Sequence, residues 1–132
     1  MSQKRVLLYY HDAHRDQSEP SGSVGRRGLI PVERSIQSGD TIGETLRLLI
    51  RGELSSEERA RGVETEFPLA GLALENVQLL DDVLRLTFAD PLRRTCGGAS
   101  RVSILWSQIE ETAMQFPEVR RVICEPDELF QP

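Results

Sequence analysis

The hydrophobic positions of the chain follow two spacings, one typical of strands and one typical of helices. Apolar, β-forming runs at 6–10, 29–36 and 119–124 predict extended strands. Pro31 has no backbone N–H to donate, which favours an edge position for the second run. Alternating apolar and polar residues over 77–88, interrupted by two aspartates, predict a hairpin with one apolar face.

Two helices are predicted between the second strand and the hairpin. Thr41 and Glu44 have the spacing of a capping box, and apolar residues follow at helical spacing, so the first helix is expected to begin there. Gly52 is expected to end it, because glycine readily adopts the left-handed conformation of a C-cap. A shorter helix is expected from Ser55, as its N-cap, to Gly62.

The longest predicted helix covers 102–116 and is followed by Pro117. Ser100 is its expected N-cap, by the preference of serine for that position. Its solvent side is expected to carry Ser103, Ser107, Gln108, Glu110, Glu111 and Gln115.

The order of predicted elements is strand, strand, helix, short helix, strand, strand, helix, strand (ββααββαβ). This order predicts an α+β fold, a two-layer sandwich with two main helices on one face of a small mixed β-sheet. The last strand should run parallel to the strand that ends near Phe88, through a right-handed crossover.

Length and composition indicate one globular domain. The chain has 132 residues, of which 39% are hydrophobic, and its longest apolar run is far shorter than the roughly 20 residues of a membrane helix. Sixteen basic residues against 21 acidic ones give a net charge of −5, which argues against nucleic acid as a partner. We expect residues 1–5 to form a tail, 6–124 the domain, and 125–132 a flexible C-terminal tail.

The chain carries no motif for catalysis, and neither a cofactor nor a metal is predicted. His11, Asp12, His14 and Asp16 are residue types that bind transition metals, but they enter a loop without visible supporting groups, so a solvated loop is the preferred interpretation. The Gly-x-x-Gly sequence at 22–25 is interpreted as linker rather than as an RNA clamp.

The segment before the longest helix is the candidate binding site. Gly97 and Gly98 lead into the helix, where backbone N–H groups can hold an anion, and Arg93, Arg94 and Arg101 lie nearby in sequence. An ordinary glycine-containing turn explains the same residues.

The two cysteines, Cys96 and Cys124, each follow or end a predicted strand. If these strands are parallel neighbours, both cysteines lie at the same edge of the sheet. A disulfide is expected in an oxidising compartment, and free buried thiols are the alternative.

Ordered motifs over nearly the whole chain resemble the GerMN domain, the sporulation and spore-germination module. The likeness is carried by Tyr9-Tyr10-His11-Asp12, by Leu29-Ile30-Pro31-Val32-Glu33-Arg34, and by the segments 45–52, 58–68, 77–88, 108–116 and 119–122. The chain departs from the family pattern at Glu53, Asp81-Asp82 and Glu125-Pro126, which affects loops more than the fold.

The resemblance implies a non-catalytic module of bacterial envelope lipoproteins and membrane-anchored proteins, related to ring-building motifs of sporulation channels. It implies an extracytoplasmic location, an anchor absent from this chain, and a protein partner in the envelope or self-association. A peptidoglycan-related ligand is also implied. The alternative function is a ligand-binding domain that takes a cell-wall fragment or small anion at the Gly97-Gly98 helix start.

Overall fold

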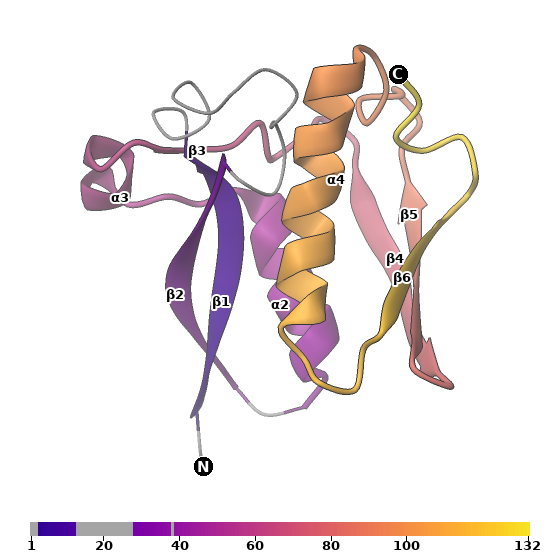
Figure 1. The fold of residues 1–132 in the computed structure, drawn as a ribbon, viewed down its shortest axis with the longest axis horizontal. Helices are drawn as coiled ribbons and strands as arrows, with labels where there is room; N and C mark the ends of the chain where they lie inside the picture. The colour runs from indigo at the N-terminus through magenta and orange to yellow at the C-terminus, as the bar shows by residue number, and fades with distance from the viewer. Residues whose placement is uncertain (1–2, 13–27, 38) are drawn as a thin grey trace.

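The computed structural model describes residues 3–12, 28–37 and 39–132 (Figure 1). Its strands are β1 (Gln3–Asp12), β2 (Leu29–Gln37), β3 (Val63–Glu64), β4 (Ala73–Leu80), β5 (Val83–Ala89) and β6 (Arg121–Glu125), and its helices are α2 (Thr41–Arg51), α3 (Ser56–Ala60) and α4 (Ala99–Met114). Apart from the short β3, the elements come in the predicted order.

The α+β class is confirmed, but the strands form two sheets instead of one. The first sheet has the order β2-β1-β3, with antiparallel pairs, and the second has the order β4-β5-β6. In the second sheet β4 and β5 are antiparallel, while β5 and β6 are parallel, as the sequence predicted. Pro31 lies on β2, which is an edge strand, as expected.

Helix α4 explains why the two sheets do not join. It runs alongside β1 in Figure 1. Because β3 pairs only with His11 and Asp12, the edge of β1 before His11 has no strand partner, and polar side chains of α4 and its C-cap bind the backbone there. The Gln115 carboxamide accepts a hydrogen bond from the Leu7 N–H at 3.0 Å and donates one to the Leu7 carbonyl at 2.6 Å. Thr112 Oγ1 accepts from the Tyr9 N–H at 3.0 Å. These side chains replace a neighbouring strand, since a buried backbone group needs a partner.

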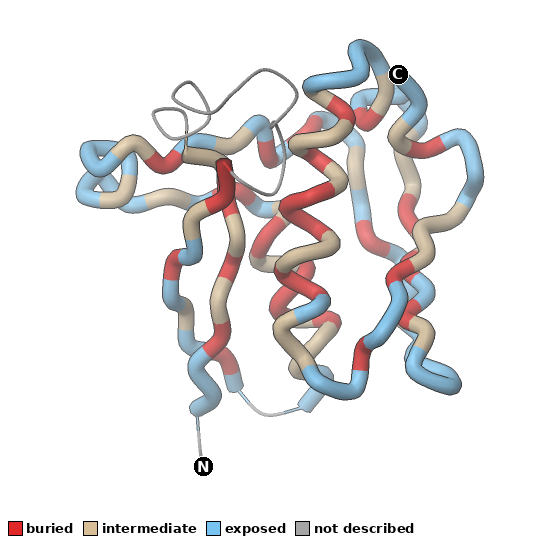
Figure 2. The backbone as a smooth tube through the Cα atoms, viewed as in Figure 1, coloured by how far each residue is buried: buried red, intermediate tan, exposed pale blue. Residues whose placement is uncertain are grey.

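The hydrophobic core is shared by both sheets and the two longer helices. Leu8 of β1, Leu46 of α2, Leu84 of β5 and Leu105 of α4 belong to one buried cluster. Figure 2 shows buried positions on α2 and α4 and on strands of both sheets, and the two helices contact strands of each sheet. The helices are therefore a middle layer, and the prediction of both on one face of a single sheet is wrong.

The predicted solvent side of α4 is also wrong in part. Ser107 and Gln108 are buried, together with Thr112. The sequence expectation assumed that polar residues on a helix face water. In this fold a second layer covers them, and hydrogen bonds to Gln108 and Thr112 satisfy their polar groups.

Helix starts differ from the expectations at two of the three helices. Asp40 is the N-cap of α2, and its side chain accepts from the Gly43 N–H at 3.0 Å, so Thr41 is the first helical residue. Gly98 rather than Ser100 precedes α4 as N-cap, without a side-chain cap. The Ser55 capping box of α3 is confirmed.

The C-terminal segment packs on the domain, although the sequence favoured a flexible tail. Leu129 is buried, and the Phe130 ring meets the rings of Phe88 and Trp106 at centroid distances of 6.5 and 5.6 Å. The Phe130 N–H donates to Thr95 Oγ1 at 3.2 Å. These aromatic contacts, the buried Leu129 and the hydrogen bonds to the 95–97 loop together hold the segment on the domain.

Candidate functional site

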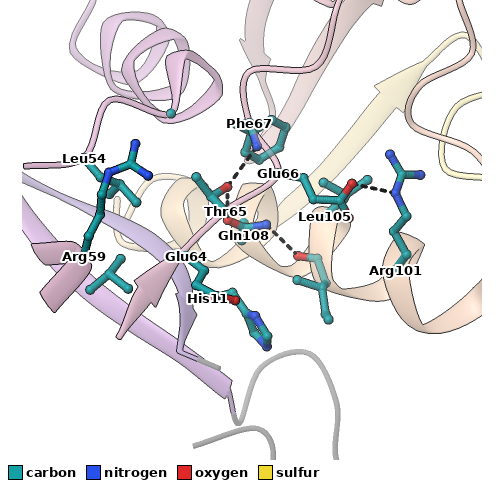
Figure 3. Close-up of a pocket in the computed structure, with 13 residues that line it drawn as sticks. His11, Leu54, Arg59, Glu64, Thr65, Glu66, Phe67, Arg101, Leu105 and Gln108 are labelled. Atoms are coloured by element: carbon teal, nitrogen blue, oxygen red, sulfur yellow. Dashed lines mark hydrogen bonds and ion pairs between the residues drawn. The ribbon is translucent and has the colours of Figure 1, made fainter. Parts of the chain in front are cut away.

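A pocket of about 670 Å³ opens between the segment around β3 and the first half of α4 (Figure 3). Its size lies within the usual range of small-molecule sites. The lining residues are His11, Gly52, Leu54, Arg59, Val63, Glu64, Thr65, Glu66, Phe67, Arg101, Ile104, Leu105 and Gln108.

The inner wall of the pocket combines apolar side chains with a polar pair, the half-buried Thr65 and the buried Gln108. Thr65 Oγ1 donates to Gln108 Oε1 at 2.9 Å and accepts from the Phe67 N–H at 3.2 Å. Gln108 Nε2 donates to the Ile104 carbonyl at 3.3 Å. Leu105, beside them, is fully buried. The pair therefore holds the 65–67 segment against α4.

The charged residues of the pocket rim come from different elements. Arg101 of α4 forms an ion pair with Glu66, with Nε and Oε1 2.8 Å apart. The same guanidinium donates to the carbonyls of Cys96, at 2.8 Å, and Arg94. Arg59 of α3 lies across the pocket, as Figure 3 shows. Arg101 is thus committed to holding the 94–96 loop, while Arg59 is exposed.

Part of the predicted anion site before α4 makes contacts within the protein. The Gly97 N–H donates to the Gln131 carbonyl at 2.8 Å, and Gly98 is the N-cap with φ 84°. Arg93 Nη2 lies 4.0 Å from the sulfur of Cys96. The structure brings Arg93, Arg94, Gly97 and Gly98 close to Arg101 in one segment, in which the Gly97 N–H and the Arg101 guanidinium bind carbonyls of the protein.

Asp90 is the residue of this loop that sequence reasoning missed. Its Oδ2 accepts from the N–H and the hydroxyl of Thr95 at 2.9 and 2.7 Å, and its Oδ1 accepts from the Arg94 N–H at 2.8 Å. Burial alone would raise the pKa of the Asp90 carboxyl, but these hydrogen bonds outweigh it and lower the pKa. Asp90 therefore positions the chain that leads to Gly97 and α4.

Cys96 and Cys124 are free thiols in the structure, and both residues are half-buried. The Cys96 thiol donates to the Glu128 carbonyl at 3.2 Å. Cys124 pairs with Leu86 in the second sheet, and burial raises the pKa of its thiol to about 12. A thiol with such a pKa is unreactive at neutral pH.

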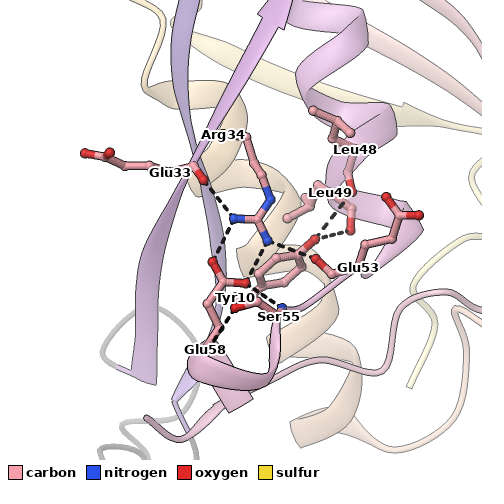
Figure 4. Close-up of polar contacts among 8 residues, drawn as sticks. All are labelled: Tyr10, Glu33, Arg34, Leu48, Leu49, Glu53, Ser55 and Glu58. Carbon is pink, nitrogen blue, oxygen red and sulfur yellow. Dashed lines mark hydrogen bonds and ion pairs between the residues drawn. The ribbon is translucent and has the colours of Figure 1, made fainter. Parts of the chain in front are cut away.

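A second polar cluster joins α3 to the first sheet (Figure 4). The Arg34 guanidinium binds both oxygens of Glu58, with Nη1–Oε2 and Nη2–Oε1 distances of 2.7 and 2.8 Å. Arg34 Nη2 also donates to the Glu53 carbonyl at 2.9 Å. The bidentate ion pair fixes α3 on β2, and the bond to the Glu53 carbonyl fixes the loop after α2 there too.

Tyr10 lies inside this cluster. Its ring is fully buried, and its hydroxyl donates to the Leu49 carbonyl at 3.0 Å. Burial is the main cause of the raised pKa of the Tyr10 hydroxyl, so it stays a neutral donor. The bonded carbonyl belongs to the last turn of α2, and it also accepts from the Gly52 N–H at 3.2 Å.

No group of three metal-binding side chains exists among the residues that the structure describes. His14, Asp16 and the Gly-x-x-Gly segment at 22–25 lie outside those residues. Within the described part of the chain, no helix is both long enough and apolar enough to cross a membrane.

These elements define an α+β domain in which a pair of helices separates two three-stranded sheets. The chain belongs to the Germane family, described as sporulation and spore germination, whose model matches residues 7–124. This match confirms the resemblance seen in the sequence motifs.

A solved structure shows the same fold. The tandem GerMN domains of the sporulation protein GerM from Bacillus subtilis are similar at a TM-score of 0.65 and 18% identity. The match covers 98% of this chain and 42% of that one, so the present chain spans less than half of its length. No curated protein matches the chain.

Proposed function

We propose that the chain is a non-catalytic interaction module of the cell envelope that docks on a protein partner. Membership of a sporulation and germination family supports a role in that setting. The envelope location and an anchor outside this chain rest on the family resemblance. The observation that carries the docking role is a pair of neighbouring leucines on the surface of β4.

Leu79 and Leu80 are 39% and 60% exposed, and they follow one another at the end of β4. Leu92 and Met114 are the other large hydrophobic residues exposed in the described part of the chain, and they lie on different elements. Single exposed leucines are ordinary, whereas two exposed leucines at the end of a strand with a free edge, one on each face of the strand, favour contact with another chain that adds to this edge.

Crosslinking in the organism's own cells tests the docking role. A photoreactive amino acid replaces Leu80 in the full-length protein, and a second variant carries it at Arg61, which is exposed on another element. We expect a discrete crosslinked product from position 80 and none from position 61. Equal products from both positions, or none from position 80, would contradict docking at β4.

Mass spectrometry of the native protein from fractionated cells tests the location. We expect recovery with the envelope fraction and an N-terminal segment or lipid that anchors it. An unmodified protein in the cytosol would overturn the envelope role.

The pocket beside α4 supports small-ligand binding as a second candidate function. It is better suited than the Gly97-Gly98 turn, because it has apolar walls and a volume of about 670 Å³. A muropeptide mixture is the first probe. We expect saturable shifts of pocket amides in NMR spectra, lost in Leu54→Arg and kept in the control Leu92→Arg. Unchanged shifts in Leu54→Arg would rule the pocket out.

A further inference from the structure

We propose that the free edge of β4, over residues 76–80, binds an extended strand of another protein, whose apolar stretch has a basic residue at each end. This inference rests on the proposed docking function and names the chemistry of the partner. Figure 2 shows this end of the β4–β5 hairpin as exposed.

The other strand edges in the described part of the chain are blocked or short. β2 carries Pro31, Glu33 and Arg34, and proline and charge both discourage pairing. Gln115 and Thr112 occupy the free edge of β1. The remaining edge strands in the described part of the chain are β3, with 2 residues, and β6, with 5, and both are shorter than β4, with 8.

The register of the hairpin shows which backbone groups of β4 are free. Leu80 pairs with Val83 across a two-residue turn, and Gln78 pairs with Arg85. Residues beside such a turn exchange their hydrogen bonds within the hairpin, and the pattern alternates along the strand. The N–H and carbonyl groups of Val77 and Leu79 therefore point to the open edge.

The other end of β4 is closed. Arg47 of α2 donates from Nη2 to the Leu74 carbonyl at 3.3 Å, and the pairing register shifts between Leu74 and Asn76. A bulge at this place ends regular pairing. An added strand therefore has about five residues of β4 to pair with, enough for a typical recognition strand.

The charges at the two ends of this edge indicate the partner. Glu75 and Asp81 flank residues 76–80, both are exposed, and neither forms an ion pair with a described residue. A lysine or arginine at each end of the partner strand complements them. A second copy paired antiparallel about Gln78 places Glu75 near Asp81 of its neighbour, and facing like charges are unfavourable.

The partner strand needs apolar side chains on both faces. Val77 and Leu79 pair with Leu86 and Leu84, whose side chains are buried in the core. Leu80 lies on the opposite face, because side chains alternate along a strand. An added strand with β-branched residues covers Leu79 on one face and Leu80 on the other.

Peptide titration of the isotope-labelled chain tests the proposal. The probe is acetyl-Lys-Val-Val-Thr-Val-Val-Lys-amide, which carries valine on both faces, and the control peptide has glutamate at both ends. We expect NMR shifts centred on the Val77 and Leu79 amides and slower hydrogen exchange there. We expect the lysine peptide to bind about tenfold more tightly at low salt.

Two kinds of variant separate edge pairing from general binding. Leu79→Pro removes one outward N–H without removing a hydrogen bond to β5, so peptide binding should be lost. The double variant Glu75→Lys with Asp81→Lys should reverse the preference to the glutamate peptide, even where the proline variant folds poorly. Glu118→Lys, at an exposed site between α4 and β6, should leave the preference unchanged.

The outcomes distinguish this inference from the proposed function. Shifts confined to another surface, or equal binding of both peptides, would overturn the edge proposal. Concentration-dependent broadening at 76–80 without peptide would instead identify a second copy as the occupant. A crosslink from Leu80 in cells with no peptide binding leaves the docking function standing without strand addition. Peptide binding at the edge without a crosslink from Leu80 in cells would support strand addition at β4 and contradict the proposed docking function.

Discussion

At the scale of single residues, Glu58 shows how one carboxylate connects three parts of the chain. It receives two hydrogen bonds from Arg34 and one from the Ser55 N–H at 3.0 Å. The Arg34 hydrogen bonds are the main reason that the pKa of Glu58 falls from 4.5 to about 2, against the opposing effect of burial. The folded state therefore binds this proton less readily than the unfolded state does.

The sign of the pH dependence follows from this lowered pKa. The stabilisation by Glu58 is complete above pH 4.5 and declines as the pH falls toward 2. Glu58→Gln should lower the free energy of unfolding at pH 7 by about 1–3 kcal/mol, because a charged hydrogen-bond acceptor is lost. Urea unfolding at several pH values should show that the free energy of unfolding of this variant falls less steeply below pH 4.5 than that of the original chain.

Glu57→Gln is the matched control, because Glu57 is the exposed neighbour of Glu58 in α3. It should keep the acid dependence of the original chain. If the stability of Glu58→Gln falls with pH as steeply as that of the original chain, other carboxylates cause the acid dependence.

Gly52 has a conformation and a contact that both require glycine. Its φ is 61°, and a Cβ atom at this position would overlap the Phe67 carbonyl oxygen. Gly52→Ala should cost about 1–3 kcal/mol of unfolding free energy in chemical denaturation. Gly52→Asn should cost nearly as much, because asparagine tolerates the backbone angle but has the same Cβ. Recovery of stability in the asparagine variant would show that only the angle matters.

At the scale of elements, α4 acts both as a core helix and as the cover of a strand edge. Its apolar residues were found from their helical spacing, and the structure confirms Val102, Leu105 and Ile109 as buried. Gln108 was expected on the solvent side and lies in the pocket wall instead. Hydrophobic periodicity could not reveal this role, because it assigns every polar residue to the solvent side. It does not distinguish a glutamine in water from one that is buried and hydrogen-bonded.

Gln115→Ala should lower the free energy of unfolding, because it leaves backbone groups of β1 without hydrogen-bond partners. The change removes both bonds to the Leu7 backbone, so we expect a loss of about 1–3 kcal/mol in unfolding free energy. Faster amide exchange at Leu7 should accompany it. Met114→Ala, at the exposed neighbouring position, should cost much less. Equal losses in the two variants would argue against the edge contact.

At the scale of the whole molecule, one core joins two sheets that share no strand. Leu8 of the first sheet and Leu84 of the second are both fully buried in the same cluster. The chain should therefore unfold in one cooperative transition. Neither small sheet has a separate core to retain its structure when the other is lost.

Alanine at either leucine tests this cooperativity. Leu8→Ala and Leu84→Ala should each lower stability by about 2–5 kcal/mol, as buried leucine truncations do. The midpoints from far-ultraviolet circular dichroism and from Trp106 fluorescence should move together in both variants. Trp106 contacts Phe130 in the C-terminal segment, so its emission reports on the second sheet's side. Separate midpoints in Leu8→Ala would show that the first sheet unfolds alone.

The sequence by itself determined every element except the short β3, together with the α+β class and the family. Local signals sufficed for these, such as the Asp81-Asp82 turn with φ values of 52° and 68°, Pro31 on an edge, and the Ser55 capping box. Each depends on residues close together in the chain. The ordered series of such motifs also carried the family assignment, although no single motif was specific.

Only the tertiary structure decided that the strands divide into two sheets and that Arg34 meets Glu58. It also placed Phe130 against Trp106. These contacts join residues 24 or more positions apart, and hydrophobic periodicity does not say which partner a face or an edge will meet. The pocket and the open β4 edge depend on the same choices, since both are defined by what the rest of the chain leaves uncovered.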